Sequence, residues 1–182
     1  MLYSEIVVAG CGNPLYADDG FGPAVIEEMQ KLSLPDNVTI IDAGLGGPHF
    51  VFTLLDPEVT KKLIIIDIAD YGAEPGQITK LKPEDLPPGA YRDAHSWDLA
   101  EPLQRIKDQI EITIIGVQPK RVTAPEFEIG LSEEIQKAIP KTIRVILETI
   151  GVNYEFSRVD LRKEERQPGG STIKTGSCTE KC

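Results

Sequence analysis

Short runs of β-branched and other apolar residues recur along the chain, separated by longer stretches in which apolar residues repeat at helical spacing. Four of these runs are almost continuously apolar, at residues 5–9, 38–41, 63–66 and 112–117. Such runs are typical of strands buried on both faces, as in a parallel sheet covered by helices. A fifth run, at residues 77–81, alternates polar and apolar positions, which indicates an edge strand with one solvated face that can run antiparallel.

The helical spacing predicts three helices, at residues 21–32, more loosely at 97–106, and from 132 to 150. Pro140 falls inside the last of them and is expected to kink or divide it, because proline lacks the backbone N–H that a helix interior needs. The alternation of strands and helices indicates an α/β fold in which a mostly parallel sheet lies between helices.

Composition divides the chain into a globular part and a polar tail. With 182 residues, 41% of them hydrophobic, the chain suffices for one domain with its own core, which we assign to residues 1–156. Residues 157–182 are charged and then rich in Gly, Ser, Thr and Lys, so a mobile tail is expected. The formal charge is −10, and the tail's six Lys and Arg against four Asp and Glu leave −12 on residues 1–156. This acidic surface disfavours nucleic-acid binding.

The sequence carries no sign of a membrane or secreted protein. No apolar run approaches the length of a membrane span, and residues 1–5 lack the basic and apolar regions of a signal peptide. Three cysteines, Cys11, Cys178 and Cys182, are too few and too unevenly spaced for a disulfide framework, which fits a reducing compartment. A soluble, cytoplasmic protein is therefore expected.

The first predicted strand runs into a loop that contains Gly10, Gly12, Asp18 and Asp19. Its Gly-x-Gly opening is shared with dinucleotide-binding loops, but Leu15 stands where that fingerprint has a third glycine. Two adjacent carboxylates would also repel a pyrophosphate at the N-terminus of the following helix. A nucleotide- or phosphate-binding module is therefore the weaker alternative.

Other candidate site residues follow later strands. Asp42 comes after the second predicted strand, Asp67 comes after the third, and His95 stands in a proline-rich loop region. A charged residue at the end of an apolar strand costs free energy unless it is solvated or has a function. Two carboxylates and one imidazole with open coordination positions would suit a borderline cation such as nickel.

Each of these residues also has a purely structural interpretation. Asp18 or Asp19 can help to cap the following helix, and Asp42 can form a turn. Asp67 can accept hydrogen bonds from backbone amides of the next loop. Cys11 is interpreted as a small residue tolerated near a tight turn and not as a nucleophile.

Together, these motifs resemble those of the hydrogenase maturation endopeptidases, including the branch that serves archaeal deazaflavin-reducing hydrogenases. The likeness covers roughly residues 5–154, and its most specific part is Gly10-x-Gly12-Asn13-x-Leu15-x-x-Asp18-Asp19-Gly20-x-Gly22. Supporting motifs are Asp42-Ala43-Gly44, Leu63-Ile64-Ile65-Ile66-Asp67 with Pro75-Gly76, the His95 loop, and Gly116-Val117-Gln118-Pro119. The resemblance implies a twisted five-stranded sheet between helices.

The resemblance also implies a function and a site. It implies an aspartyl-type endopeptidase that recognises nickel in the precursor of a nickel-iron hydrogenase large subunit and removes the C-terminal extension of that precursor. By position, the family's metal-binding and catalytic cluster falls on Asp19, Asp67 and His95, although many members have Glu where this chain has Asp19. Nickel would arrive with the substrate, so no tightly bound metal of the protein's own is expected. A maturation chaperone that senses nickel without cutting stays open as a second alternative.

Overall fold

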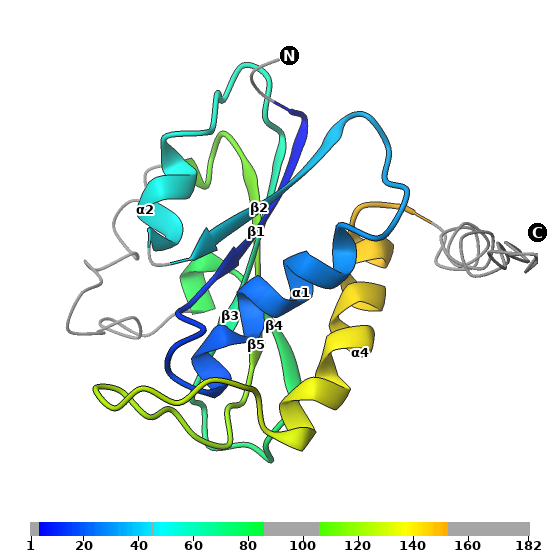
Figure 1. Ribbon diagram of the computed structural model, residues 1–182. Coiled ribbons are helices and arrows are strands. Elements are labelled where there is room, and N and C mark those ends of the chain that lie inside the picture. The colour runs from blue at the N-terminus through cyan, green and yellow to red at the C-terminus, as the bar shows by residue number, and fades with distance from the viewer. Residues whose placement is uncertain (1–3, 45, 86–105, 153–182) are drawn as a thin grey trace, which may run out of the picture.

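A five-stranded sheet forms the centre of the computed structural model, which describes residues 4–44, 46–85 and 106–152 (Figure 1). The strands lie in the order β2-β1-β3-β5-β4. The first three along the chain are parallel to β5, and β4 pairs antiparallel with β5 at one edge. The predicted parallel sheet and its antiparallel edge strand are thus confirmed. The bounds are β1 (Ile6–Cys11), β2 (Val38–Gly44), β3 (Lys62–Ile68), β4 (Ile78–Leu81) and β5 (Glu111–Val117).

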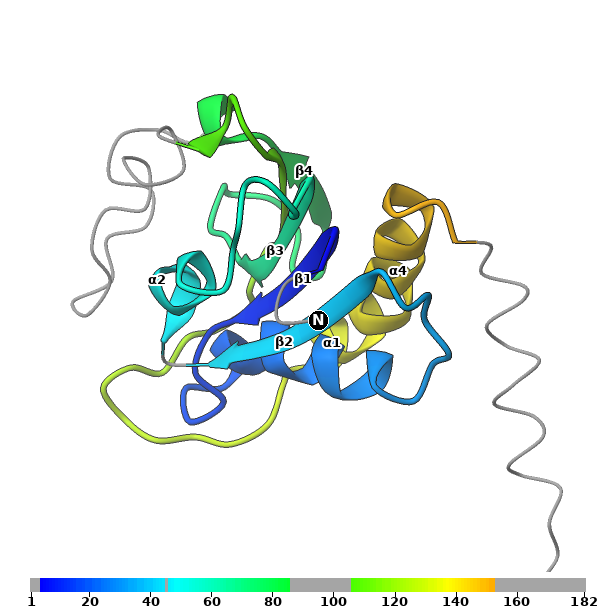
Figure 2. The same ribbon diagram turned by 90° about the horizontal axis from the view of Figure 1, so that it is seen from above.

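Helices cover both faces of the sheet, as the sequence predicts. α1 (Phe21–Met29) and α4 (Glu133–Thr149) lie on one face and α2 (Gly47–Phe52) on the other (Figure 2). Two short 3-10 helices, η1 (Asp18–Gly20) and η2 (Pro83–Asp85), complete the described elements. The sequence did not predict α2, because six residues that begin with glycine and proline are too few to show a helical period.

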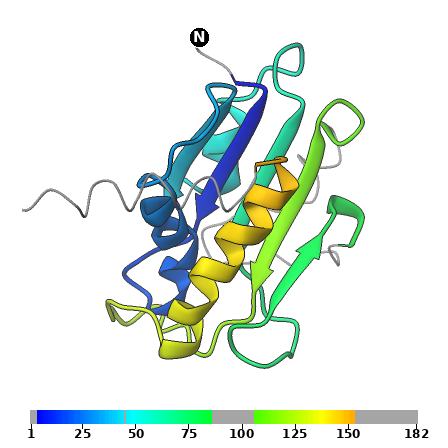
Figure 3. The same ribbon diagram turned by 90° about the vertical axis from the view of Figure 1, so that its right-hand side faces the viewer.

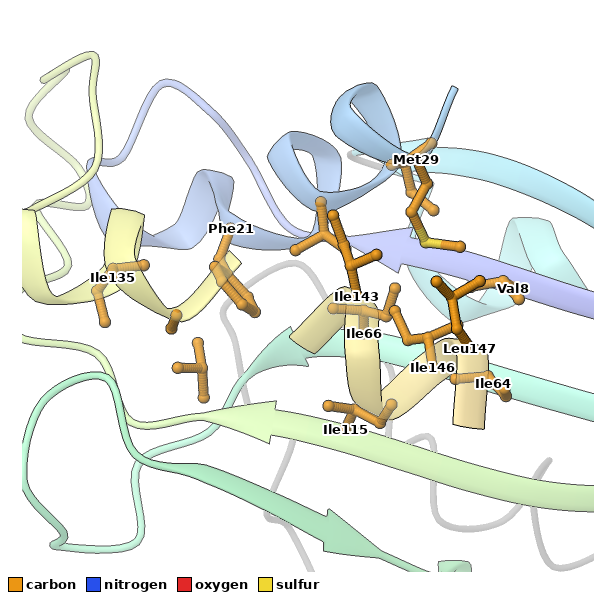
Figure 4. Packing of buried hydrophobic residues seen from close by; sticks show 14 residues of the cluster. Val8, Phe21, Met29, Ile64, Ile66, Ile115, Ile135, Ile143, Ile146 and Leu147 are labelled. Atoms are coloured by element: carbon orange, nitrogen blue, oxygen red, sulfur yellow. The ribbon is translucent and has the colours of Figure 1, made fainter. Parts of the chain in front are cut away.

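A hydrophobic core on each face of the sheet explains why the central strands are almost continuously apolar. Side chains of a strand point alternately to opposite faces, so Ile64 and Ile66 of β3 pack toward α1 and α4, whereas Leu63 and Ile65 pack on the α2 side. Figure 4 shows the first of these layers, in which side chains of α1 and α4 meet those of β1, β3 and β5. Burial on both faces leaves few positions in the central strands for a polar residue without a function.

Helix α1 lies directly on β1 because two glycines meet where they cross. A Cβ on Gly10 would stand 2.3 Å from the carbonyl oxygen of Gly22, and a Cβ on Gly22 would stand 2.2 Å from that of Cys11. Any larger residue at either position would push the helix away from the sheet. The two Gly-x-Gly pairs of the first motif therefore serve backbone packing, and this packing fixes η1, which immediately precedes α1, at the end of β1.

Pro140 does not divide α4, which runs without a break from Glu133 to Thr149 across the face of the sheet (Figure 3). Of the two effects expected of Pro140, a kink or a division, the division was therefore wrong. Pro140 and Gln136, one turn before it, both lie on the exposed side of α4. The carbonyl group of Gln136 would normally accept a hydrogen bond from the backbone N–H of residue 140, which proline lacks. Water can satisfy that carbonyl on the exposed side, which makes the proline tolerable.

Some predicted features lie outside the described residues. The predicted helix at 97–106 falls almost entirely there, as do His95 and the tail at 157–182 with Cys178 and Cys182. Among the residues that the structure does describe, no helix is both long enough and apolar enough to cross a membrane.

Candidate active site at the carboxyl edge of the sheet

The carboxyl ends of β1 and β3 bring Cys11 and Asp67 together. The two strands are parallel neighbours in which Gly10 pairs with Ile66, so the residue that follows each lies at the same level of the sheet. Asp67 is only 9% exposed, and one of its carboxylate oxygens accepts a hydrogen bond from the backbone N–H of Ile68 at 2.8 Å. A nearly buried carboxylate at the ligand-binding edge of an α/β sheet is a candidate for chemistry.

Asp19 is held against the turn that follows β1. Its Oδ2 accepts a hydrogen bond from the backbone N–H of Asn13 at 2.9 Å. Gly12 has a φ of +117°, and a Cβ added to it would stand 2.0 Å from the carbonyl oxygen of Asp19. Only glycine fits this conformation and this close approach. Asp19 therefore lies beside the residue that follows Cys11, and its half-buried side chain keeps access to solvent.

The electrostatics of Cys11 follow from its burial beside two carboxylates. Burial raises the pKa of the Cys11 thiol well above its usual range, and the negative charges of Asp67 and Asp42 raise it further. A buried thiol that stays protonated is a poor nucleophile, which agrees with the structural interpretation of Cys11. We call Asp19 and Asp67, with Cys11 and Gly12 between them, the carboxylate edge.

Asp18 has a structural role that differs from the predicted helix cap. Its side chain is 0% exposed and accepts hydrogen bonds from the backbone N–H groups of Lys120 and Arg121, each at 2.9 Å, and of Ser132 at 2.7 Å. The Ser132 hydroxyl donates a further bond at 2.8 Å. We call this arrangement the Asp18 clasp. It ties both ends of the segment between β5 and α4 to the segment before α1, and it leaves Asp18 without access to a metal ion or a substrate.

The other two structural interpretations can also be compared with the geometry. Helix α1 has Gly20 at its N-cap and no side-chain cap there, so neither Asp18 nor Asp19 caps it. Asp42 accepts a hydrogen bond from the backbone N–H of Gly44 at 2.9 Å, which confirms it as a turn former.

Gln118, directly after β5, is a positioning residue that belongs to one of the supporting motifs but received no role from the sequence. Its carboxamide oxygen accepts hydrogen bonds from the backbone N–H groups of Tyr71 and Ala73, at 2.9 and 3.2 Å, and its nitrogen donates to Asp70 at 3.1 Å. The 7% exposed side chain thus fixes the turn that begins just after Asp67. A polar residue that closes an apolar strand before a proline was the available signal.

Only two of the three residues of the predicted metal cluster are among those that the structure describes. Asp19 and Asp67 both lie at the carboxylate edge, but His95 is outside the described residues. Within the described ranges, no group of three or more His, Cys, Asp and Glu side chains is arranged to hold a metal ion. The assignment of Asp19, Asp67 and His95 as a joint site therefore stays a prediction.

Comparison with known proteins decides the family. A family model described as hydrogenase maturation protease matches residues 23–149, which include Asp67, His95 and the motif around Gln118. The chain belongs to the hydrogenase maturation protease family. It is accordingly a hydrolase of the peptidase class. The phosphate-binding alternative loses its support, because the glycines of the first motif are occupied by backbone packing.

Individual hydrogenase maturation proteases and related proteins agree with this placement. A curated relative, coenzyme F420 hydrogenase subunit delta from Methanothermobacter thermautotrophicus, is 45% identical over an alignment of 154 residues that covers 82% of this chain and 97% of the relative. This agrees with the archaeal branch that the sequence motifs indicated. The solved structure of the maturating endopeptidase HybD from Escherichia coli matches with a TM-score of 0.65 at 26% identity and covers 80% of this chain and 91% of that one. A hydrogenase 2 maturation peptidase from Thaumarchaeota archaeon SCGC_AB-539-E09 matches with a TM-score of 0.61 at 28% identity, over 82% and 100%.

Proposed function

We propose that this protein cuts the C-terminal extension from the precursor of a nickel-iron hydrogenase large subunit, after nickel has been inserted into that precursor. Asp19, Asp67 and His95 are the residues proposed to bind the nickel of the substrate. The family supplies the reaction class, and the 45% identical relative, a subunit of a coenzyme F420 hydrogenase, suggests an archaeal hydrogenase of that kind as the source of the precursor.

The observation that carries the proposal is the carboxylate edge. Two carboxylates from distant parts of the sequence flank the Cys11–Gly12 backbone where parallel strands end. Neither is needed as a helix cap, and Asp18, the neighbouring acid, is fully used by its clasp. Carboxylate oxygens and an imidazole are a suitable ligand set for a divalent ion of intermediate softness.

The chemistry that these groups can perform is hydrolysis of a positioned amide. Binding of the substrate's nickel would fix the scissile bond next to the carboxylate edge, and positioning of this kind accounts for a large share of the rate enhancement in many enzymes. One carboxylate can then remove a proton from the attacking water as general base. Asp67 is the more buried of the two, and Asp19 is more open to solvent, so we assign the base to Asp19.

Nickel belongs to the substrate in this mechanism. With only three ligands, the protein would leave coordination positions for the groups that already hold nickel in the precursor. The purified protein is therefore expected to carry no stoichiometric metal after dialysis. Zinc or iron that survives dialysis in elemental analysis would indicate a conventional metallohydrolase instead.

A processing assay tests the proposal. Purified precursor, with and without nickel, is incubated with the full chain, and the mass of the large subunit is followed. A shortened large subunit is expected only when both nickel and this protein are present. If nickel-loaded precursor binds but is never shortened, the non-cleaving chaperone alternative replaces the proposal.

A further inference from the structure

A group of exposed apolar side chains lies near the carboxylate edge, on the segment before α1 and on the segment between β5 and α4. Backbone hydrogen bonds join these two segments. Phe127 is 73% exposed and Ile129 is 81% exposed, and Leu15 and Val122 are exposed to a smaller extent. Among the described residues, only two other large apolar side chains, Phe50 and Tyr71, are comparably exposed. Scattered apolar residues on a surface need no explanation, but a local concentration of them indicates a binding surface. We call Leu15, Val122, Phe127 and Ile129 the apolar strip.

The strip is built on a fixed backbone. The N–H of Ala17 donates to the carbonyl oxygen of Glu128 at 2.7 Å, and the N–H of Glu128 donates to that of Leu15 at 2.8 Å. An ion pair at 2.5 Å joins Arg121 to Glu128, and the ring of Phe127 stacks on that of Tyr16 with 5.8 Å between the centroids. The Asp18 clasp holds both ends of the projecting segment, which is the yellow-green loop of Figure 1.

The strip adjoins the turn that carries Asp19, and one of its residues lines a groove. Asn13 links the two: its side-chain oxygen accepts a hydrogen bond from the backbone N–H of Leu15 at 3.0 Å, and its own backbone N–H donates to Asp19 at 2.9 Å. Ile129 also forms one wall of a groove of about 440 Å³, whose other walls are mostly apolar and come from the first motif and α1. Glu27 and Asp42 line the same groove, so an acidic occupant is disfavoured.

We propose that the apolar strip and this groove form the docking surface for an apolar segment of the hydrogenase precursor. This rests on the proposed function for the identity of the partner. The precursor is favoured as the occupant because backbone hydrogen bonds fix the strip to the segment that carries Asp19. A substrate bound at Asp19 would therefore lie next to the strip. The chain's own residues 157–182 are a poorer match, because they are mostly polar and charged.

The test measures binding and cleavage separately with the full chain. In the variant Phe127→Ser/Ile129→Ser, the dissociation constant and the KM for nickel-loaded precursor should rise at least about tenfold, since a few residues carry most of the binding free energy of an interface. The value of kcat at saturating precursor should change less than about threefold, because the carboxylate edge is intact. Glu126→Ser, at an exposed polar position in the same loop, is the matched control and should bind like the wild type.

Other outcomes would overturn the docking proposal. Unchanged precursor affinity in the double variant excludes the strip as the docking surface. A fall in kcat with unchanged KM assigns the loop to catalysis instead. If the double variant changes only the oligomeric state in sedimentation, the strip is an interface between copies of this chain. If precursor binds the strip only after residues 157–182 are deleted, the tail is the occupant of the strip. Precursor that binds the wild type tightly through the strip without being cut would refute the proposed cleavage and leave the docking surface standing.

Discussion

Asp18 and Asp19 are adjacent in sequence, but their side chains lie in different environments. Asp18 is buried in its clasp, where three backbone N–H groups and a serine hydroxyl donate to it. Asp19 lies at the carboxylate edge, where its side chain accepts a backbone hydrogen bond from Asn13 and stays half exposed. The comparison shows that one carboxylate holds two segments together, whereas the other keeps access to solvent and is the one proposed to act in catalysis. The residue type alone does not distinguish the two.

The largest effect is expected at the open carboxylate. Asp19→Ala should lower the rate of precursor cleavage by at least about a hundredfold, because the scissile bond loses its alignment and the water loses its base. The free energy of unfolding should fall by only about 1 kcal/mol, since the side chain is partly exposed and caps no helix, and the loss of its hydrogen bond from Asn13 is a small change beside the loss of the clasp. Single-turnover cleavage and denaturant titration measure the two quantities. Asp19→Glu, which keeps the carboxylate on a longer side chain, should keep measurable activity.

Substitution of Asp18 should lower the stability of the fold far more than substitution of Asp19 does. Asp18→Ala leaves buried N–H groups of Lys120, Arg121 and Ser132 without their acceptor, and it should lower the free energy of unfolding by about 3 kcal/mol or more. For a domain of this size the midpoint of thermal unfolding should fall by about 10 °C. Asp19→Ala is the matched control. A stability of Asp18→Ala equal to that of the wild type would show that the clasp does not hold the loop.

A smaller effect concerns the thiol between the carboxylates. Because burial and the charges of Asp67 and Asp42 raise the pKa of Cys11, its thiolate fraction should stay small through the pH range in which an ordinary thiol ionises. In a Cys178→Ser/Cys182→Ser background, alkylation of the folded protein at pH 9 should be at least about ten times slower than that of a free thiol. Labelling as fast as in the unfolded protein would mean that Cys11 is exposed and ionised.

No effect on cleavage is expected from removal of residues 157–182, because that stretch has no apolar periodicity with which to pack on the domain. The truncated chain should process precursor with kcat and KM within about twofold of the full chain, as measured in the same assay. Loss of processing with an intact fold would assign the tail, including Cys178 and Cys182, a role in substrate contact.

Much of the fold could be predicted because it depends on local patterns. The continuous apolar runs indicated parallel strands, and the alternating run at 77–81 indicated the edge strand, since burial on one or two faces leaves different periods. The continuity of α4 through Pro140 could not be predicted, because it depends on which side of the helix faces solvent.

The site was less accessible from sequence. Strand ends indicated that Asp67 would lie at the carboxyl edge, because parallel strands end together. The separation of Asp18 from Asp19 depends on partners more than 100 residues away, and no local pattern carries that information. The role of Gln118 likewise follows from contacts with a distant turn.

Single-turnover cleavage of nickel-loaded precursor by Asp19→Asn tests the central claim most directly. Asparagine keeps the size of the side chain and an oxygen that can accept the hydrogen bond from Asn13, but it removes the negative charge. We expect a folded protein of nearly unchanged stability in which cleavage is lost to the same extent as in Asp19→Ala. Cleavage at the wild-type rate would contradict the proposed role, because the charge of Asp19 would then not be needed and Asp18, enclosed in its clasp, could not take its place.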